Sequence, residues 1–361
     1  MSLPESLSQP TLEPLAAAGR ESVRTVVIGY GFAARSFHSY LVERAPGLTL
    51  HGVAVRDPEK RARLAAERPD AKAYETFEDA LADPDVDLVV LATPNSTHCD
   101  LAVAALEAGK HVVSDKVMCL SLAECRRMLE AANRHQRLLA VFQNRRFDGD
   151  YLTVKSLMES GEELGEARYL EMAWQGFGAW GGWRGRAEMG GGRFYDLGAH
   201  LIDQALTLFP EPVAHVYCRM HHDYENHDIE SEALCVIAFE GGRTAVCDLS
   251  GMSAISKPRF LVRGTRATFQ KFGLDPQEEA MKAGDIDAAV EPEENYGRLK
   301  GTDVDRVVPT LPGRWRTYYE RIAETLLHGA PPPVTHAEMY RVMSVLDAAL
   351  TSARTGEVVK P

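Results

Sequence analysis

A histidine and two carboxylates are spaced so that one helix face would present them together. Asp196, His200 and Asp203 fall at positions i, i+4 and i+7, which lie on one stripe of a helix. A histidine beside a carboxylate can act as a general base, because its pKa lies near neutrality and the neighbour orients its ring. A histidine that serves only the structure is the alternative. No H-E-x-x-H motif and no second nearby histidine accompanies the group, so we expect no metal site.

An aspartate–lysine pair forms a second reactive group. Asp115 and Lys116 follow the short apolar run His111–Val113, which is typical of a buried strand. If that strand belongs to a doubly wound sheet, the pair lies at the carboxyl edge, where such sheets bind ligands. A lysine there can donate to a substrate hydroxyl, and its charge can lower the pKa of that hydroxyl. A lysine that merely ends a strand is the alternative.

A glycine-rich turn predicts a nucleotide site. Gly29-Tyr-Gly31-Phe-Ala-Ala34 has the G-x-G-x-x-A form and follows the β-branched run Arg24–Ile28. The first glycine permits the tight turn, the second lets the backbone approach a pyrophosphate, and a small third residue allows close helix–strand packing. The helix that follows offers free N–H groups to phosphate oxygens. We expect the cofactor to contact the loop residues Gly29, Tyr30, Gly31, Phe32 and Ala33.

The end of the second strand bears on the choice of cofactor. An acid there binds the ribose 2′-hydroxyl of NAD, whereas an arginine accommodates the 2′-phosphate of NADP. The strand ends Val55-Arg56-Asp57, so Arg56 favours NADP. NAD is the alternative, because a shift of one residue would make Asp57 the ribose ligand.

The secondary structure expected to position these residues differs between the two halves of the chain. Strand-like and helical segments alternate from residue 21 to residue 142, which predicts a Rossmann domain with a doubly wound parallel sheet. Residues 143–361 carry consecutive strand-like segments between helices, which predicts an α+β domain with an open, mainly antiparallel sheet. Residues 1–20 read as a flexible tail, and residues 275–310 as a polar loop.

The composition of the chain argues against several classes of protein. The 361-residue chain has a formal net charge of −12 and no long basic run, which argues against nucleic acid as a partner. Its six cysteines include no C-x-x-C pair, so neither a disulfide framework nor a zinc ribbon is expected. No apolar stretch is long enough to span a bilayer, and the N-terminal residues resemble no signal peptide. We therefore expect a cytoplasmic globular protein that does not engage membranes.

Four motifs together resemble those of the glucose–fructose oxidoreductase, inositol dehydrogenase and rhizopine-catabolism (Gfo/Idh/MocA) family of nicotinamide-dependent oxidoreductases. They are Gly29–Phe32, Thr93-Pro-Asn-Ser-Thr-His98, Ala108–Lys116 and the segment Gly190–Asp203. The segments Phe142–Asp148 and Tyr195–Phe209 look most similar to a subgroup of uncharacterised oxidoreductases and NADP-dependent scyllo-inositol dehydrogenases. The resemblance extends from about Arg24 to the C-terminus.

The resemblance implies roles for individual residues. Lys116 matches the lysine of the family's E-K-P motif, and Asp196 and His200 match its catalytic pair. Cofactor contacts are implied for Thr93, Pro94, Asn95, His98 and Asp115, and substrate contacts for Asn144, Arg145, Trp183 and Arg184 besides Asp196 and His200. Two positions depart from the pattern: the motif here is Asp115-Lys116-Val117, without its proline, and Gln143 replaces the subgroup's histidine. The resemblance also implies that residues 143–361 form a substrate-binding and oligomerisation domain, and that the protein is a homodimer or homotetramer.

These observations predict an enzyme that transfers a hydride between a secondary hydroxyl of a sugar or inositol-like polyol and NADP or NAD. His200 would take the hydroxyl proton and Lys116 would polarise the oxygen, although Lys116 could be the base instead. Two other functions remain open: a non-catalytic nucleotide- or sugar-sensing protein, and a glycoside-cleaving enzyme with tightly bound NAD.

Overall fold

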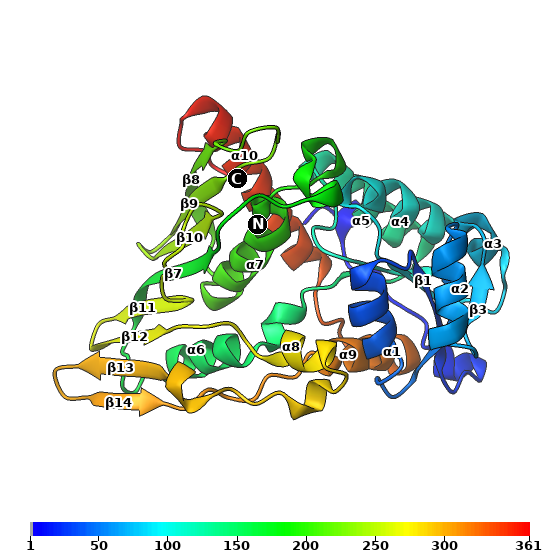
Figure 1. The fold of residues 1–361 in the computed structure, drawn as a ribbon, viewed down its shortest axis with the longest axis horizontal. Coiled ribbons are helices and arrows are strands. Elements are labelled where there is room, and N and C mark those ends of the chain that lie inside the picture. The colour runs from blue at the N-terminus through cyan, green and yellow to red at the C-terminus, as the bar shows by residue number, and fades with distance from the viewer. Residues whose placement is uncertain (1–2) are drawn as a thin grey trace. The chain divides into compact units, whose positions relative to one another are not determined.

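The computed structural model describes residues 3–361, which fold into two compact units (Figure 1). The first unit runs to Gln143 and also takes in Trp315–Tyr340. The second unit consists of Asn144–Arg314 and Arg341–Pro361. The first break coincides with the boundary expected near residue 142. Residues 315–340, expected in the C-terminal domain, instead pack with the first unit.

The first unit is built on a six-stranded parallel sheet with the strand order β3-β2-β1-β4-β5-β6. Its order reverses between β1 and β4, which makes the carboxyl ends of these strands the natural ligand site. The strands are β1 (Val23–Ile28), β2 (Leu48–Ala54), β3 (Lys72–Tyr74), β4 (Leu88–Leu91), β5 (His111–Ser114) and β6 (Leu139–Val141). The helices are α1 (Tyr40–Val42), α2 (Pro58–Glu67), α3 (Phe77–Ala82), α4 (His98–Glu107), α5 (Leu122–His135) and α9 (Arg316–His328).

This sheet has the expected Rossmann character. Every residue of β4 and β5 is buried, because helices on both faces of a parallel sheet exclude water from it. The one βα unit that the sequence did not suggest is β3 with α3. Its strand is only three residues long and two of them are exposed, so no apolar run marks it.

The described part of the N-terminal segment packs on the first unit, where a flexible tail was expected. The Leu7 side chain is buried, and the Asn133 side chain donates to the Ser8 carbonyl at 3.1 Å. The His336 backbone N–H donates to the Gln9 side chain at 3.0 Å. Residues 1 and 2 lie outside the described residues.

The second unit is built on an eight-stranded sheet with the order β14-β13-β12-β11-β7-β10-β9-β8. Only β7 and β10 pair in parallel, so the sheet is mainly antiparallel, as expected. The strands are β7 (Ala167–Gln175), β8 (Val213–His221), β9 (Glu232–Phe239), β10 (Thr244–Ser250), β11 (Phe260–Gly264), β12 (Ala267–Lys271), β13 (Gly297–Gly301) and β14 (Asp305–Val308). The helices are α6 (Gly149–Ser160), α7 (Ala199–Leu208), α8 (Gln277–Lys282) and α10 (His336–Thr355), whose first residues pack with the first unit.

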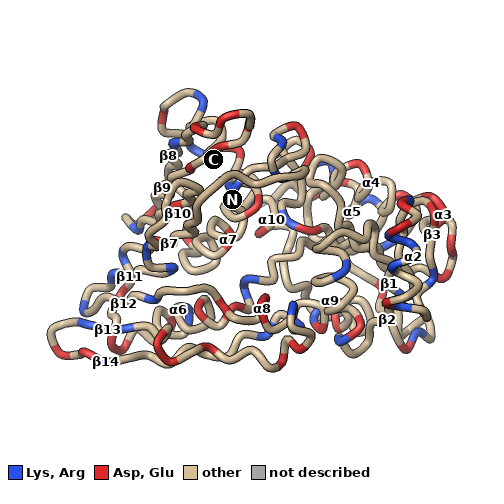
Figure 2. Tube along the Cα trace, in the orientation of Figure 1, with Lys and Arg blue, Asp and Glu red and all other residues tan. Residues whose placement is uncertain are grey.

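The prediction of a loop over residues 275–310 was wrong, because this segment contains α8 and the β13–β14 hairpin. The hairpin carries charges of both signs (Figure 2). Arg298 forms an ion pair with Asp305 diagonally across it at 2.8 Å. The exposed outer face leaves little of the apolar alternation that identifies a strand. Backbone pairing with β12 holds β13 in the sheet, although the local sequence does not predict a strand there.

Candidate active site

The glycine turn joins β1 to the helical segment Ala33–Ser39. Gly29 has a φ of +97°, and a Cβ there would lie 2.8 Å from the Ala92 carbonyl oxygen, so the fold itself requires this glycine. Gly31 differs, because a Cβ added to it would meet no protein atom within 4 Å. Packing within the protein does not require Gly31, whereas close approach of a dinucleotide pyrophosphate would. This part of the chain therefore fits a nicotinamide dinucleotide.

Two aromatic residues of the loop differ in exposure. The Tyr30 side chain is buried, donates to Glu67 Oε2 at 2.8 Å and accepts from Arg68 at 2.7 Å. These contacts attach the loop to the end of α2, which leaves the backbone of Tyr30 as the part best suited to a phosphate. Phe32 is 46% exposed, and its ring packs edge-on against Phe37.

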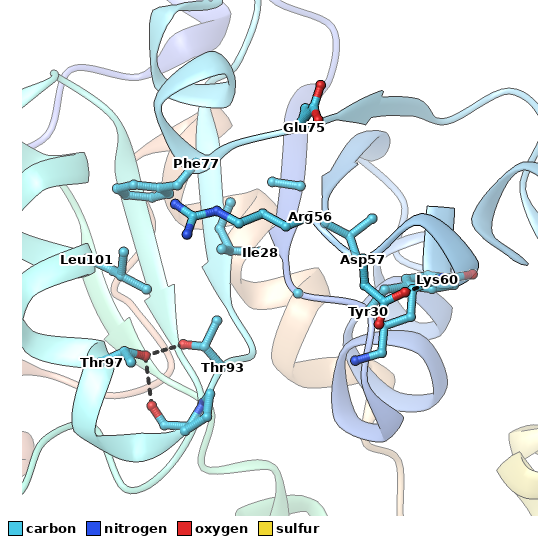
Figure 3. A pocket seen from close by; sticks show the side chains of 14 residues that line it. Ile28, Tyr30, Arg56, Asp57, Lys60, Glu75, Phe77, Thr93, Thr97 and Leu101 are labelled. Carbon is cyan, nitrogen blue, oxygen red and sulfur yellow. Dashed lines mark hydrogen bonds between the residues drawn. The ribbon is translucent and has the colours of Figure 1, made fainter. Parts of the chain in front are cut away.

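A pocket of about 420 Å³ lies beside this turn, within the first unit. Its volume suits the nucleoside half of a dinucleotide. Apolar walls come from Ile28, Phe77 and Leu101, and charged groups come from the end of β2 and the first turn of α2 (Figure 3). The complete lining is Ile28, Gly29, Tyr30, Ala54, Val55, Arg56, Asp57, Lys60, Glu75, Phe77, Thr93, Pro94, Thr97 and Leu101.

Arg56 and Asp57, the two alternative ribose residues, are in different situations. The Arg56 side chain is 78% exposed and extends across the pocket toward Phe77 (Figure 3). Asp57 caps α2, because its Oδ1 accepts the backbone N–H groups of Glu59 and Lys60 at 2.9 and 3.2 Å. One carboxylate oxygen of Asp57 is therefore committed to the helix, whereas Arg56 can follow a ligand.

The loop after β4 forms another wall of the pocket. The Thr93 and Thr97 hydroxyl oxygens are 2.6 Å apart, and Thr97 also donates to the Pro94 carbonyl at 2.8 Å (Figure 3). Asn95 is buried. His98 exposes no surface, and its ring nitrogens lie 3.0 Å from the Thr93 carbonyl oxygen and 2.9 Å from that of Val117. His98 thus ties two loops together from behind, and burial lowers the pKa of its imidazole.

Asp115 and Lys116 follow β5 at the carboxyl edge of the parallel sheet, as expected. Both are half-buried. The Asp115 carboxylate accepts the Lys116 backbone N–H at 2.8 Å, and its other oxygen lies 3.3 Å from His38 Nε2. Burial alone would raise the pKa of Asp115, but the charge and contact of His38, with the charge of Lys116, hold that pKa at about 2.

Asp196 and His200 lie in the second unit, on one continuous helix formed by Phe194–Gly198 and α7. Arg184 Nε donates to Asp196 Oδ2 at 3.3 Å, and the Arg184 guanidinium also stacks on the Trp183 ring at 4.6 Å. The two residues expected to contact substrate, Trp183 and Arg184, are thus grouped with Asp196.

His200 itself is buried, and its ring lies nearly parallel to that of Trp174, with 6.3 Å between centroids. Trp174 is the neighbour of His200 that the sequence did not reveal. It belongs to β7, where aromatic residues are ordinary strand formers, so only the fold brings it to the histidine.

Two further residues expected to contact substrate are held inside the second unit. Asn144 and Arg145 are both buried. Arg145 lies 3.2 Å from Asp148 and 3.1 Å from Glu278, with its guanidinium 4.5 Å from the centre of the Trp174 ring. Arg145 is therefore ion-paired and lies against the same Trp174 ring that neighbours His200.

No group of three or more histidine, cysteine, aspartate or glutamate residues within 3–361 is arranged to hold a metal ion. Across the same residues, no helix combines the length and apolar character that crossing a membrane requires.

Comparisons with known proteins agree with this description. Residues 23–143 match the family model "Oxidoreductase family, NAD-binding Rossmann fold", and residues 151–270 match the "GFO/IDH/MocA C-terminal domain". The uncharacterised oxidoreductase YdgJ of Escherichia coli is 34% identical, over 92% of this chain and 97% of its own. The NADP(+) scyllo-inositol 2-dehydrogenase IolW of Bacillus subtilis is 31% identical, over 93% of this chain and 96% of its own.

Solved structures of relatives superpose on nearly the whole chain. A crystal structure of a putative oxidoreductase from Klebsiella pneumoniae aligns with a TM-score of 0.84 and 35% identity, covering 94% of this chain and 95% of that one. The putative oxidoreductase yvaA of Bacillus subtilis aligns with a TM-score of 0.87 and 28% identity, covering 95% and 98%. The chain therefore belongs to the GFO/IDH/MocA family of oxidoreductases, and its first unit is the family's NAD-binding Rossmann fold.

Proposed function

We propose that this chain is an NAD(P)-dependent dehydrogenase that oxidises a secondary hydroxyl of a sugar or inositol-like cyclic polyol. The observation that carries the proposal is the placement of Asp196 and His200 one turn apart on one continuous helix, with Arg184 on the carboxylate and Trp174 beside the imidazole. Inositol is also named for relatives: IolW is 31% identical, and an inositol 2-dehydrogenase of Salmonella is 36% identical over 94 residues.

The side chains divide the work of removing a hydride and a proton. The bound oxidised nicotinamide would supply the hydride acceptor for the carbinol carbon. His200 takes the hydroxyl proton at an imidazole nitrogen. Lys116 Nζ donates to the same oxygen, which stabilises negative charge as the proton leaves. Asp196, held by Arg184, orients the substrate or the imidazole.

For the cofactor we propose NADP in preference to NAD. The exposed Arg56 guanidinium can pair with a 2′-phosphate in two parallel hydrogen bonds. Lys60 lines the same pocket from the first turn of α2 and brings a second positive charge. Asp57 would have to bind the ribose while also capping α2, which favours Arg56 as the residue that selects the cofactor.

The expected homodimer or homotetramer stays a prediction. Sedimentation velocity across a range of protein concentrations measures it directly, and a single monomer peak at micromolar concentration would contradict it.

The decisive experiment is nicotinamide reduction measured against inositol isomers and common aldoses, with NADP⁺ and NAD⁺ in parallel. Replacing His200→Ala should lower kcat by roughly 100-fold or more, the usual contribution of a general base, with little change in cofactor affinity. If wild-type protein binds cofactor tightly but turns over none of the polyols or aldoses, the proposal fails. Unchanged kcat in H200A would remove the histidine from its role.

The pH dependence of kcat, measured for wild type and for variants of each residue, distinguishes the two candidate bases. Loss of the acidic limb in H200A assigns the base to His200, whereas loss of a limb only in Lys116→Met assigns it to Lys116.

A further inference from the structure

Two buried histidines hold the chain on either side of Lys116. On one side, His98 Nδ1 lies 2.9 Å from the Val117 carbonyl oxygen. On the other, His38 Nε2 lies 3.3 Å from Asp115 Oδ2. Only the second contact continues to the lysine itself, because the other oxygen of Asp115 accepts the Lys116 backbone N–H at 2.8 Å.

His38 is held in turn by the helix α9. It exposes no surface, its Nδ1 lies 2.7 Å from the Tyr319 hydroxyl, and its ring packs at 4.6 Å from the Phe142 ring. Tyr319 is also fully buried. Nδ1 is thus the ring nitrogen on the side of Tyr319, and Nε2 is the ring nitrogen on the side of Asp115. The Tyr319 hydroxyl, the Asp115 carboxylate and the Phe142 ring thus surround the imidazole and restrict its orientation.

The Asp115 carboxylate needs such a partner. Burial disfavours its charged form, yet the charge and contact of His38, together with the charge of Lys116, keep its pKa at about 2. A charged carboxylate that loses its buried partner turns toward water or another donor. Because the same carboxylate accepts the Lys116 N–H, its rotation would release the main chain at the lysine.

We propose that His38 is a positioning residue for Lys116, which acts through Asp115, and that Tyr319 fixes the orientation of His38. The proposal rests on the proposed function only in taking Lys116 to participate in turnover. His38 does not contact substrate. It holds the main chain from which the lysine side chain extends, and misplacement of that side chain by about 1 Å costs roughly 100-fold in rate.

Three variants and a control test this role. His38→Phe keeps the ring volume and removes both nitrogens, His38→Gln restores an N–H donor, and Tyr319→Phe removes one hydroxyl. His336→Phe is the matched control, because His336 is an equally buried histidine of the first unit whose contact, 3.2 Å to the Leu7 carbonyl, does not involve the sheet's carboxyl edge. Each protein is compared for hydrogen–deuterium exchange of the peptide containing Lys116, for kcat and KM, and for NADP affinity.

In H38F the Lys116 peptide should exchange faster, and kcat should fall by roughly 100-fold with cofactor affinity within about twofold of wild type. H38Q should recover most of both effects, Y319F should show a smaller form of them, and H336F should show neither. Wild-type exchange of the Lys116 peptide in H38F overturns the proposal, as does equal loss of kcat in H38F and H336F. If Lys116→Met retains wild-type turnover, the role of Lys116 in the proposed function fails. The exchange measurement alone then tests whether His38 holds the main chain at Lys116.

Discussion

Arg146 and Asp203 form a two-pronged ion pair, with Nε to Oδ2 at 2.8 Å and Nη2 to Oδ1 at 2.7 Å. Asp203 shares its helix with His200, and its side chain is 2% exposed. The third member of the predicted polar stripe is therefore occupied in joining α7 to the segment Asn144–Phe147. Its neighbour Gln204 makes a similar join, donating to the Arg145 carbonyl and accepting from Arg259.

Replacing Asp203→Ala should lower the free energy of unfolding by about 3 to 5 kcal/mol, because it breaks a two-pronged ion pair that is almost completely shielded from water. Urea denaturation measures the change. Asp305→Ala removes an exposed partner of Arg298 and serves as the control, for which we expect no measurable loss. Equal effects of the two substitutions would contradict the structural role of Asp203.

The two glycines of the nucleotide turn should respond differently to alanine. Gly29→Ala forces a side chain into a left-handed backbone and against Ala92, so it should cost about 1 kcal/mol or more of stability. Gly31→Ala meets no protein atom and should leave the melting temperature unchanged while weakening cofactor binding. Thermal unfolding and fluorescence titration with NADP separate the two effects. Normal cofactor affinity in stable G31A would argue against a pyrophosphate at this turn.

The cofactor preference should change with Arg56 and not with the charge of Asp57. Arg56→Ala should weaken NADP binding by at least about tenfold, because even one of the two charged hydrogen bonds is worth about 1.5 kcal/mol, and should leave NAD binding unchanged. Asp57→Asn removes the charge but keeps the cap of α2, so neither stability nor NADP affinity should fall. Asp57→Ala separates capping from binding, because it should cost about 1 kcal/mol of stability. A large loss of NAD affinity in D57N would make Asp57 the ribose ligand and reverse the preference.

Stability should fall in moderate acid because of His111. Burial lowers the pKa of this imidazole to about 3, and the charge of Arg137 adds to the effect. In the unfolded chain its pKa is about 6.5. Between those values the unfolded chain binds a proton that the folded chain does not, so the free energy of unfolding decreases as the pH falls through this window and is unaffected above it.

The contribution of His111 is at most about 1.4 kcal/mol per pH unit. Urea denaturation between pH 7 and pH 4 should therefore show a shallower decline for His111→Gln than for wild type. Parallel slopes for the two proteins would rule out His111 as the source.

The sequence predicts the Rossmann unit well because its signals are local. The apolar runs of β1, β4 and β5 predict buried strands, and the glycine turn predicts the position of the nucleotide site. The surroundings of the reactive groups are a different matter. His38 and Trp174 lie in ordinary helical or strand sequence and Arg259 lies just before β11, and only tertiary packing brings them to Asp115, His200 and Gln204.

The surroundings of Arg145 were also not predictable from the sequence. The resemblance implies a substrate contact for Arg145, and the structure adds ion pairs with Asp148, three residues along the chain, and with Glu278 from a distant segment. Pairing of that kind depends on which loops meet, and neither composition nor periodicity reveals it.

The return of α9 to the first unit has a consequence for how the protein is made. Tyr318 donates to the Val141 carbonyl at 2.8 Å and Tyr319 contacts His38, but both tyrosines are synthesised only after the whole of Asn144–Arg314. At ordinary ribosomal speeds that interval lasts roughly 10 to 30 s. During this interval the apolar surface that α9 later covers on the nascent Rossmann unit stays exposed. We therefore expect a chaperone to matter most just before α9 emerges.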